Sequence, residues 1–222
     1  MDNAHVKAPC RVAIMVSGHG RGSNMAAIIE ACQSGEAPAT VGLVLGTRRD
    51  APALERAQQA GVETVVISPK RFEGDDSAYA DAVLTALAQR KIDLVCLAGY
   101  MRILPGPVVA ACRNRVMNIH PALLPLFGGP GMYGEHVHEA VLASGMKLSG
   151  CTVHIVDEQY DTGPIVVQLA VPVEEGDTPA TLAARVLEAE HRAYPAAVRL
   201  FAQGRLRVEG RCVRVLPEDA VQ

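Results

Sequence analysis

The sequence predicts an α/β protein with a doubly wound, mostly parallel sheet. Short apolar runs alternate with longer segments of helical spacing, as expected for parallel strands joined by right-handed helical crossovers. Aromatic residues make up only 4% of the chain and Trp is absent. Ala, Val and Leu must therefore fill the interior, as they do in sheets covered by helices on both faces. The length of 222 residues suits one domain of this class or two small ones.

The first half of the chain has the more regular rhythm. The apolar runs predict strands at 11–16, 41–45, 63–67 and 93–98. The segments between them predict helices at 24–34, 51–60 and 77–90. The last of these strands, DLVCLA, is almost wholly apolar, which is typical of a strand buried on both faces.

The second half is less regular. A short strand at 116–119 leads into a loop rich in Pro and Gly at 121–134, and a helix is expected at 135–144. Two β runs at 150–156 and 164–171 flank a polar turn, so we expect them to pair.

The chain should close with a long helix. Thr178 and Pro179 suit its N-cap and first turn, Pro195 should kink it, and Gly204 should end it. We interpret residues 1–222 as a single domain with its core at about 11–207 and a short flexible tail at each end, the last one at 217–222.

Charge and composition exclude several classes of protein. The formal net charge of −3 argues against a nucleic-acid binder, but an anionic small molecule can still be held by local dipoles. The six cysteines form no C-x-x-C pair, which suits a reducing compartment. No apolar run approaches the roughly 20 residues needed to span a bilayer, and no signal peptide is visible. We therefore expect a cytoplasmic protein without membrane or nucleic-acid partners.

A glycine-rich segment, SGHGRGSN at residues 17–24, lies between the first strand and the first helix. Glycines allow close approach of a ligand to the backbone, and the helix N-terminus offers free N–H groups, so a bound phosphate is favoured. The spacing matches neither the dinucleotide motif nor the Walker motif, and no acidic residue ends the second strand, which disfavours a nicotinamide cofactor. The alternative is a plain turn with Ser23 or Asn24 as N-cap.

A second candidate site is Asn118-Ile119-His120-Pro121, at the end of a predicted strand. Strand alternation places Asn118 and His120 on the same side. An amide donor and an imidazole can together stabilise an oxyanion and handle its proton. The alternative is a capped loop with a hydrogen-bonded His.

A third candidate site is the acidic turn DEQYDTG at 157–163. The carboxylate of Asp161 could orient His120 and favour its protonated form. The alternative is a solvated turn.

Other polar residues give weaker signals. His136 and His138 are two residues apart, but no Cys or acidic cluster supports them, so no metal site is expected. His154 is expected to be packed or paired on its strand. Glu190 and His191 fall in the long helix, where an ordinary polar face is the alternative to a site.

Taken in order, the motifs resemble the phosphoribosylglycinamide formyltransferase family. The segments that carry the resemblance are SGHGRGSN, LAGYMRIL, NIHPALLP, GCTVHIVDEQYDTGPIVVQ and EAEHRAYP. They extend from about residue 11 to 207, and NIHPALLP followed by the D-x-G-P turn is the most specific feature.

The resemblance implies a Rossmann-like formyltransferase fold. It also implies a reaction in which 10-formyltetrahydrofolate donates its formyl group to glycinamide ribonucleotide, in purine biosynthesis and without a metal. The implied catalytic residues are Asn118, His120 and Asp161. The residues implied to bind the ribonucleotide are Gly22, Ser23, Asn24 and Glu190. The residues implied to contact the folate are Met101, Arg102, Ile103, Leu104, Asn118 and Asp157. The implied assembly is a monomer or a homodimer.

The sequence departs from the family pattern in three segments. Its glycine-rich loop is longer than the shortest family versions, because it contains His19 and Arg21. The loop at 126–134 is also longer than KYPGLHTH of many relatives, which leaves its placement over the site open. Some relatives have a folate-contacting Arg before the equivalent of Ala78-Tyr79, where this chain has acidic residues, so that contact is either absent or supplied by Lys70 or Arg71.

Three alternatives are less consistent with the sequence. Methionyl-tRNA formyltransferase carries a further C-terminal domain, and we expect none here. Formyltetrahydrofolate deformylase has an added N-terminal domain and typically NIHHSFLP, whereas this chain has Pro121 and Leu123-Leu124-Pro125. A non-catalytic nucleotide sensor would not need Asn118, His120 and Asp161 together.

Overall fold

The computed structural model describes residues 9–18 and 20–220. Within these residues the chain forms a nine-stranded sheet of order β3-β2-β1-β4-β5-β6-β7-β9-β8. The strands are β1 Cys10–Val16, β2 Ala39–Gly46, β3 Thr64–Val66, β4 Leu94–Leu97, β5 Val116–His120, β6 Leu148–Ile155, β7 Ile165–Pro172, β8 Leu206–Glu209 and β9 Cys212–Val215. The α-helices are α1 Ser23–Gln33, α2 Pro52–Gln59, α3 Asp76–Gln89, α4 Gly106–Ala111, α5 Glu135–Ala143 and α6 Pro179–Ala202, and the 3-10 helices are η1 Pro69–Phe72 and η2 Glu218–Ala220.

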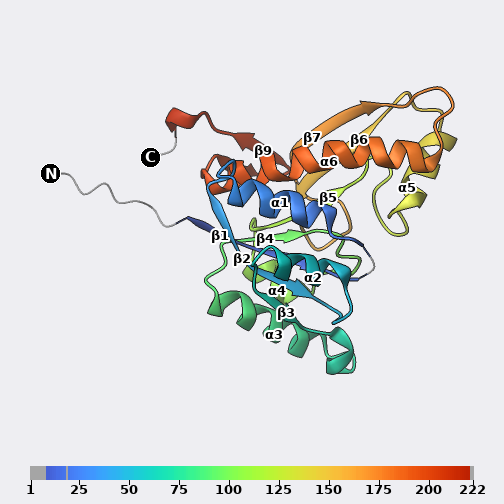
Figure 1. Ribbon diagram of the computed structural model, residues 1–222. Coiled ribbons are helices and arrows are strands. Elements are labelled where there is room, and N and C mark those ends of the chain that lie inside the picture. Colours follow the sequence, from blue (N-terminus) through green and yellow to red (C-terminus); the bar gives the residue numbers. More distant parts are fainter. Residues whose placement is uncertain (1–8, 19, 221–222) are drawn as a thin grey trace.

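Helices cover both faces of the sheet (Figure 1). Strand β1 illustrates this arrangement, because its alternate side chains pack into two separate hydrophobic cores, one on each face of the sheet. Val12, Ile14 and Val16 pack with apolar residues of α1, α2 and α6. Ala13 and Met15 pack on the other face with apolar residues of α3 and α4. This confirms the prediction of an α/β sheet whose strands are buried on both sides.

The expected order of strands and helices in the first half is confirmed, as is the pairing of the two late strands. β6 and β7 are antiparallel neighbours, whereas β1 pairs in parallel with both β2 and β4. The last helix is one continuous element from Pro179 to Ala202, with Pro195 inside it.

Three features of the fold were not predicted. Helix α4 is only six residues long, too short to show helical spacing. The β8–β9 hairpin is largely exposed and lacks a long apolar run, but β9 extends the sheet by pairing with β7 at Ile165 and Cys212. The end of the chain was expected to be frayed, yet it includes η2, and Arg205 lies 3.2 Å from the carboxylate of Glu218. The expected N-terminal tail and residues 221–222 lie outside the described residues.

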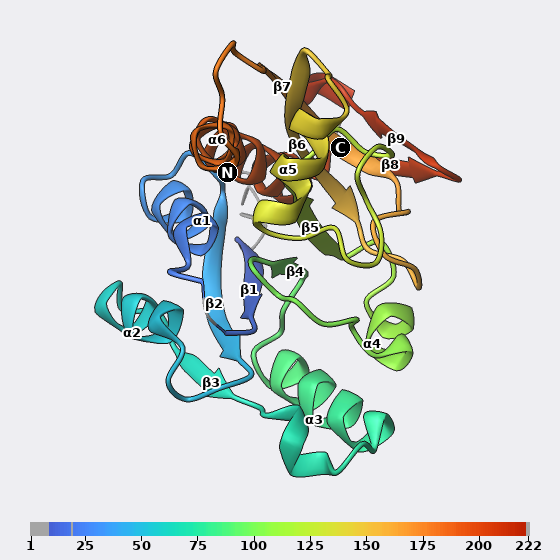
Figure 2. The same ribbon diagram turned by 90° about the vertical axis from the view of Figure 1, so that its right-hand side faces the viewer.

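The strand order places a crevice at the carboxyl ends of the parallel strands. From β1 the chain winds outward to β2 and β3, and then returns to add β4 and β5 on the other side of β1. Ligands of open α/β sheets bind where the order reverses in this way. The glycine-rich loop follows β1, and the LAGYMRIL segment begins at the last residue of β4 and follows that strand. The two predicted binding segments therefore meet here, where the Met101 N–H donates to the Ser17 hydroxyl (Figure 2).

Candidate active site

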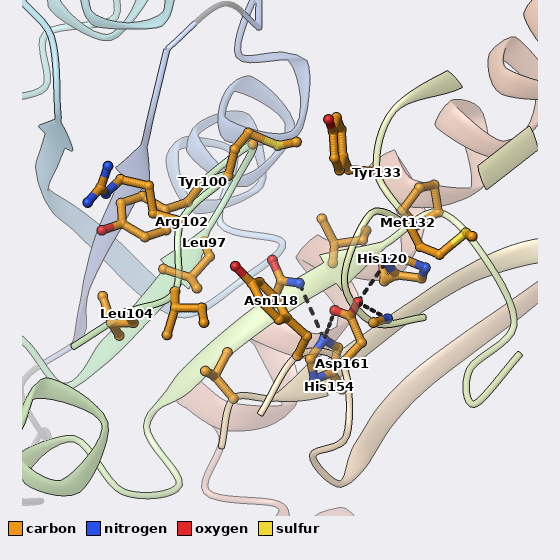
Figure 3. Close-up of a pocket in the computed structure, with 18 of the residues that line it drawn as sticks. Leu97, Tyr100, Arg102, Leu104, Asn118, His120, Met132, Tyr133, His154 and Asp161 are labelled. Atoms are coloured by element: carbon orange, nitrogen blue, oxygen red, sulfur yellow. Dashed lines mark hydrogen bonds and ion pairs between the residues drawn. The ribbon is translucent and has the colours of Figure 1, made fainter. Parts of the chain in front are cut away.

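A cavity of about 430 Å³ opens at this crevice. Its wall combines the segments that follow β4, β5 and β6 with two residues from the helical layer, Asn24 and Glu190. All three implied catalytic residues, Asn118, His120 and Asp161, line it (Figure 3). The cavity therefore gathers polar groups from segments that are far apart in the sequence.

Asn118 and His120 both belong to β5, and strand alternation turns them to the same cavity as predicted. In the antiparallel ladder Asn118 lies opposite His154 of β6. The side-chain nitrogen of Asn118 is 3.3 Å from Nε2 of His154, whose Nδ1 is 3.0 Å from the carbonyl oxygen of Ile155. Because a carbonyl only accepts, Nδ1 of His154 donates to it, and Nε2 faces both the Asn118 amide and the Asp161 carboxylate. The second N–H of Asn118 remains available to a ligand.

The ring of His120 is held from two sides. Its Nε2 donates to the carbonyl oxygen of Phe127 at 2.7 Å, and its Nδ1 lies 3.5 Å from Oδ2 of Asp161. Phe127 has a φ of +54°, an uncommon conformation for a bulky residue, and this belongs to the turn that presents its carbonyl group to His120. The loop after β5 therefore fixes the orientation of the imidazole.

Asp161 is a cavity residue and not the solvated turn residue of the alternative reading, since its side chain is 11% exposed. Its Oδ2 accepts the backbone N–H of Gly129 at 3.0 Å, and its Oδ1 lies 3.5 Å from Nε2 of His154. A side chain at Gly128 would meet Leu124 and Asp161, at 2.6 and 3.1 Å from its Cβ. The glycines of the long loop thus let the backbone approach the carboxylate.

The surroundings of Asp161 favour its ionised form. Burial raises its pKa, but hydrogen bonds with His154 and the Gly129 N–H, together with the neighbouring rings of His120 and His154, lower it by more, so the net shift is downward. Asp161 is therefore a carboxylate across the neutral pH range.

The protonation of His120 differs from the prediction. Asp161 and the Phe127 carbonyl do raise its pKa, in the expected direction, but burial lowers the pKa by more and the net shift is downward. The neutral imidazole is therefore favoured at neutral pH, and negative charge that develops beside the ring would favour the imidazolium.

The glycine-rich loop and α6 form a second corner of the cavity. Gly22 is the N-cap of α1, with a φ of +69°, so the alternative N-caps Ser23 and Asn24 are wrong. Asn24 donates its side-chain amide to Oε2 of Glu190 at 2.7 Å. Both of these residues line the cavity, whereas Gly22 and Ser23 lie just beyond its wall. His19 of this loop lies outside the described residues.

Burial sets the charge of this second corner. Glu190 is only 7% exposed, and burial raises its pKa to about 7, although the hydrogen bond from Asn24 opposes the shift. A buried, half-protonated carboxyl that faces a cavity is not the ordinary polar helix face of the alternative reading.

The implied folate-contacting residues form an apolar wall. Residues 101–104, named the folate wall below, all line the cavity, and the side chains of Met101 and Ile103 are more than half exposed. Asp157 lines the facing side, where its carboxylate accepts from the hydroxyl group of Thr162. Neither Lys70 nor Arg71 belongs to this lining, which includes Arg102 instead.

Two further parts of the site were not assigned from the sequence. His154 bridges Asn118 and Asp161, but this role depends on the β5–β6 register, which strand alternation alone does not give. The long loop, whose placement was open, covers the cavity with residues 129–134. His136 lies 3.3 Å from Glu139, and in residues 9–18 and 20–220 no group of three or more His, Cys, Asp or Glu side chains could hold a metal ion.

Comparisons with known proteins identify the family of the chain. The formyl transferase family, as a sequence family, matches residues 10–198. Phosphoribosylglycinamide formyltransferase of Escherichia coli is 38% identical over 197 residues, which is 89% of each chain. Trifunctional purine biosynthetic protein adenosine-3 of Gallus gallus is 42% identical over 89% of this chain, but the match spans only 19% of that protein.

The solved structures give the same result. Glycinamide ribonucleotide transformylase 1 of Symbiobacterium toebii is 44% identical, with a TM-score of 0.89 over 97% of this chain and 99% of that chain. Among the described residues, no helix is long and apolar enough to cross a membrane. The sequence match, the shared fold and the gathered polar residues together show that this chain belongs to the formyl transferase family.

Proposed function

We propose that the protein transfers the formyl group of 10-formyltetrahydrofolate to the amine of glycinamide ribonucleotide, a step of purine biosynthesis in the cytoplasm. The observation that carries the proposal is the cluster of Asn118, His120, His154 and Asp161 in one cavity. The relatives named as formyltransferases for this ribonucleotide support the choice of substrate. The catalytic unit is the single domain whose core is 11–207.

In this proposal, each of the two substrates binds at one end of the cavity. The ribonucleotide lies at the corner of Asn24 and Glu190, with its phosphate at the N-terminus of α1, where the first N–H groups of the helix have no intrahelical partner. The folate lies between the folate wall and Asp157, because an apolar wall with a few polar groups suits a flat, partly polar ring. This arrangement brings the amine and the formyl group together over β5.

The amine attacks the formyl carbon directly, forming a C–N bond and a tetrahedral oxyanion. No Cys or Ser occurs in the NIHP and DTGP segments to act as a covalent nucleophile. Asn118 donates its free N–H to the oxyanion. The negative charge of the oxyanion favours the imidazolium form of His120, because it opposes the effect of burial on the pKa.

Proton transfer completes the reaction. The amine loses a proton to a water molecule ordered by Asp161, and Nδ1 of His120, which faces that carboxylate, receives it. When the C–N10 bond breaks, N10 of the folate takes the proton from His120, so that charge and atoms balance. The products are the formylated ribonucleotide and tetrahydrofolate.

The test is consumption of the formyl donor with and without the ribonucleotide amine. We expect consumption only when the amine is present, with one formylated product formed for each donor consumed. Equal consumption without the amine would mean hydrolysis and would contradict the proposal, and no consumption in either case would point to a binding protein. A Thr64→Val variant, changed on β3 outside the cavity lining, should behave as the wild type does.

A further inference from the structure

Two tyrosine hydroxyl groups meet beside the folate wall. Tyr79 belongs to α3 and Tyr100 follows β4, and their hydroxyl oxygens are 3.1 Å apart. The residues are 3% and 7% exposed. Only Tyr100 lines the cavity, so Tyr79 contacts the site through its partner. The hydrogen bond therefore connects a buried helix face to a cavity-lining residue.

The pair lies in an apolar environment. Both rings belong to the core on the α3 and α4 face, and the ring of Phe72 packs edge-on against Tyr79 with centroids 5.7 Å apart. A hydroxyl group without a partner would be costly here, since an unsatisfied buried polar group loses its water without compensation. The geometry of the two rings is therefore tightly coupled.

Arg102 lies close to this pair. Burial raises the pKa of both tyrosines, and the positive charge of Arg102 opposes that shift in each of them. Figure 3 shows Arg102 beside Tyr100, on the flank of the cavity away from Asp161. Arg102, the only described Arg in the cavity lining, is thus two residues along the chain from the tyrosine that this hydrogen bond holds.

The segment at 99–104 has no regular secondary structure. Its start is held by Ser17, whose hydroxyl group lies 3.1 Å from the Gly99 carbonyl oxygen and accepts the N–H of Met101 at 2.6 Å. Beyond that anchor, Tyr100 ties the segment to α3 through Tyr79. The position of the folate wall thus depends on these two side-chain anchors and on Leu104, which is buried in the same core at the other end of the segment.

We propose that the hydrogen bond between Tyr79 and Tyr100 is a positioning contact for the formyl donor, which holds the folate wall and Arg102 in the geometry that binds folate. The proposal rests on the proposed function for the identity of the donor. It assigns no catalytic role to either tyrosine, because the pair lies away from the reacting groups. Its distinctive consequence is that a residue outside the cavity lining, Tyr79, should control folate affinity.

The experiment compares Tyr79→Phe, Tyr100→Phe and the double variant with the wild type. Binding of 5,10-dideazatetrahydrofolate, which lacks the N10 atom and cannot donate a formyl group, is measured by calorimetry, and the melting temperature is measured in parallel. Each single variant should weaken binding about three- to tenfold, as expected for the loss of one hydrogen bond. The double variant should bind no more weakly than the single variants, because all three lack the same contact.

Stability separates positioning from a purely structural role. Each single variant leaves one hydroxyl group without its partner, so the double variant, which leaves none, should recover melting temperature without recovering folate affinity. In the active enzyme, KM should rise for the folate and stay within twofold for the ribonucleotide. Thr64→Val, which breaks a side-chain hydrogen bond to Gln58 outside this cavity, should leave folate affinity unchanged.

The possible failures are distinguishable. Wild-type affinity in Tyr79→Phe, or affinity that follows melting temperature through the series, would overturn the positioning role. Binding of the analogue by a wild type that transfers no formyl group would contradict the proposed function and leave the test of the tyrosine pair intact. A wild type that does not bind the analogue would overturn both.

Discussion

The cavity contains two buried carboxyl groups in contrasting surroundings. Asp161 receives a backbone N–H from Gly129 and faces two imidazoles, and its pKa is lowered although burial opposes the shift. Glu190 receives one amide hydrogen from Asn24, and burial raises its pKa to about 7. Burial of a carboxyl group therefore does not by itself set its charge, because the number of hydrogen bonds and positive charges around it decides the direction.

The opposite pKa shifts of Asp161 and Glu190 match the proposed roles of the two ends of the cavity. The Asp161 corner, formed by Asn118, His120, His154 and Asp161, carries out the reaction, and the Glu190 corner, formed by Asn24 and Glu190, binds the ribonucleotide. An ionised Asp161 can order the water molecule that passes the proton of the amine to His120. A half-protonated Glu190 can both donate to and accept from a sugar or an amine, which suits a group that binds the ribonucleotide. Substitutions made separately at the two ends of the cavity test these roles.

Changes in the Asp161 corner should have the largest effect. Asn118→Ala, His120→Ala and Asp161→Ala should each lower kcat by on the order of 10²–10³, because each removes a group that stabilises the transition state. Their combined loss in the triple variant should be far smaller than the product of the single losses, since the residues act as a unit. The measurement is kcat for each variant, with circular dichroism to verify folding. A folded Asp161→Ala variant with near-normal kcat would leave Asp161 as a turn residue.

Glu190→Gln should have the next largest effect. It should change the free energy of unfolding, and the size of this change should depend on pH. Because the pKa of Glu190 is raised, its contribution to stability is full below about pH 4 and is lost as the pH rises through about 7. Gln resembles the protonated form, so at pH 8 the variant should be more stable than the wild type, by roughly 3 kcal/mol at most.

The check on Glu190→Gln is the free energy of unfolding from pH 4 to pH 8, together with KM for the ribonucleotide. The stability difference should vanish near pH 4, while KM for the ribonucleotide should rise and KM for the folate should not. A stability difference that is constant with pH would show that the Glu190 carboxyl group has an ordinary pKa.

Gly22→Val should have the smallest of these effects, about tenfold in KM for the ribonucleotide. The φ of +69° disfavours a side chain, and a Cβ at this position would lie 2.8 Å from Cβ of Ala53. The backbone N–H groups at the start of α1 should therefore shift away from the phosphate. Gly20→Val is a matched control in the same loop, because a Cβ there has no neighbour within 4 Å. Equal increases in KM for both substrates would contradict a phosphate site at this loop.

The regular strands and helices, and the site residues that share one strand, could be predicted from the amino-acid sequence. Strand alternation was sufficient to place Asn118 and His120 on one side of β5, because both belong to one strand. The residues alone indicated only that Asp161 could orient His120. The resemblance to the formyltransferase family is what identified Asp161 as a catalytic residue. Its position depends on the fold of the long loop, where Gly129 provides the N–H that holds the carboxylate.

The rest of the site depends on contacts that leave no local pattern. The bridge by His154 needs the register of β6 against β5, and the bond between Tyr79 and Tyr100 needs the packing of α3 beside β4. The neutral resting state of His120 follows from its depth of burial, which outweighs the partner that the sequence pointed to. Charge states in such a cavity therefore have to be read from the folded protein.

A ¹³C NMR titration of the side-chain carboxyl carbons tests the charge states of Asp161 and Glu190 most directly, with Asp161→Asn and Glu190→Gln used to assign the two signals. The signal of Glu190 should titrate near pH 7, and that of Asp161 should titrate below the usual range of an aspartate. An Asp161 signal that titrates near neutral pH, or a Glu190 signal with an ordinary pKa, would contradict the assignment of an ionised catalytic corner and a half-protonated binding corner.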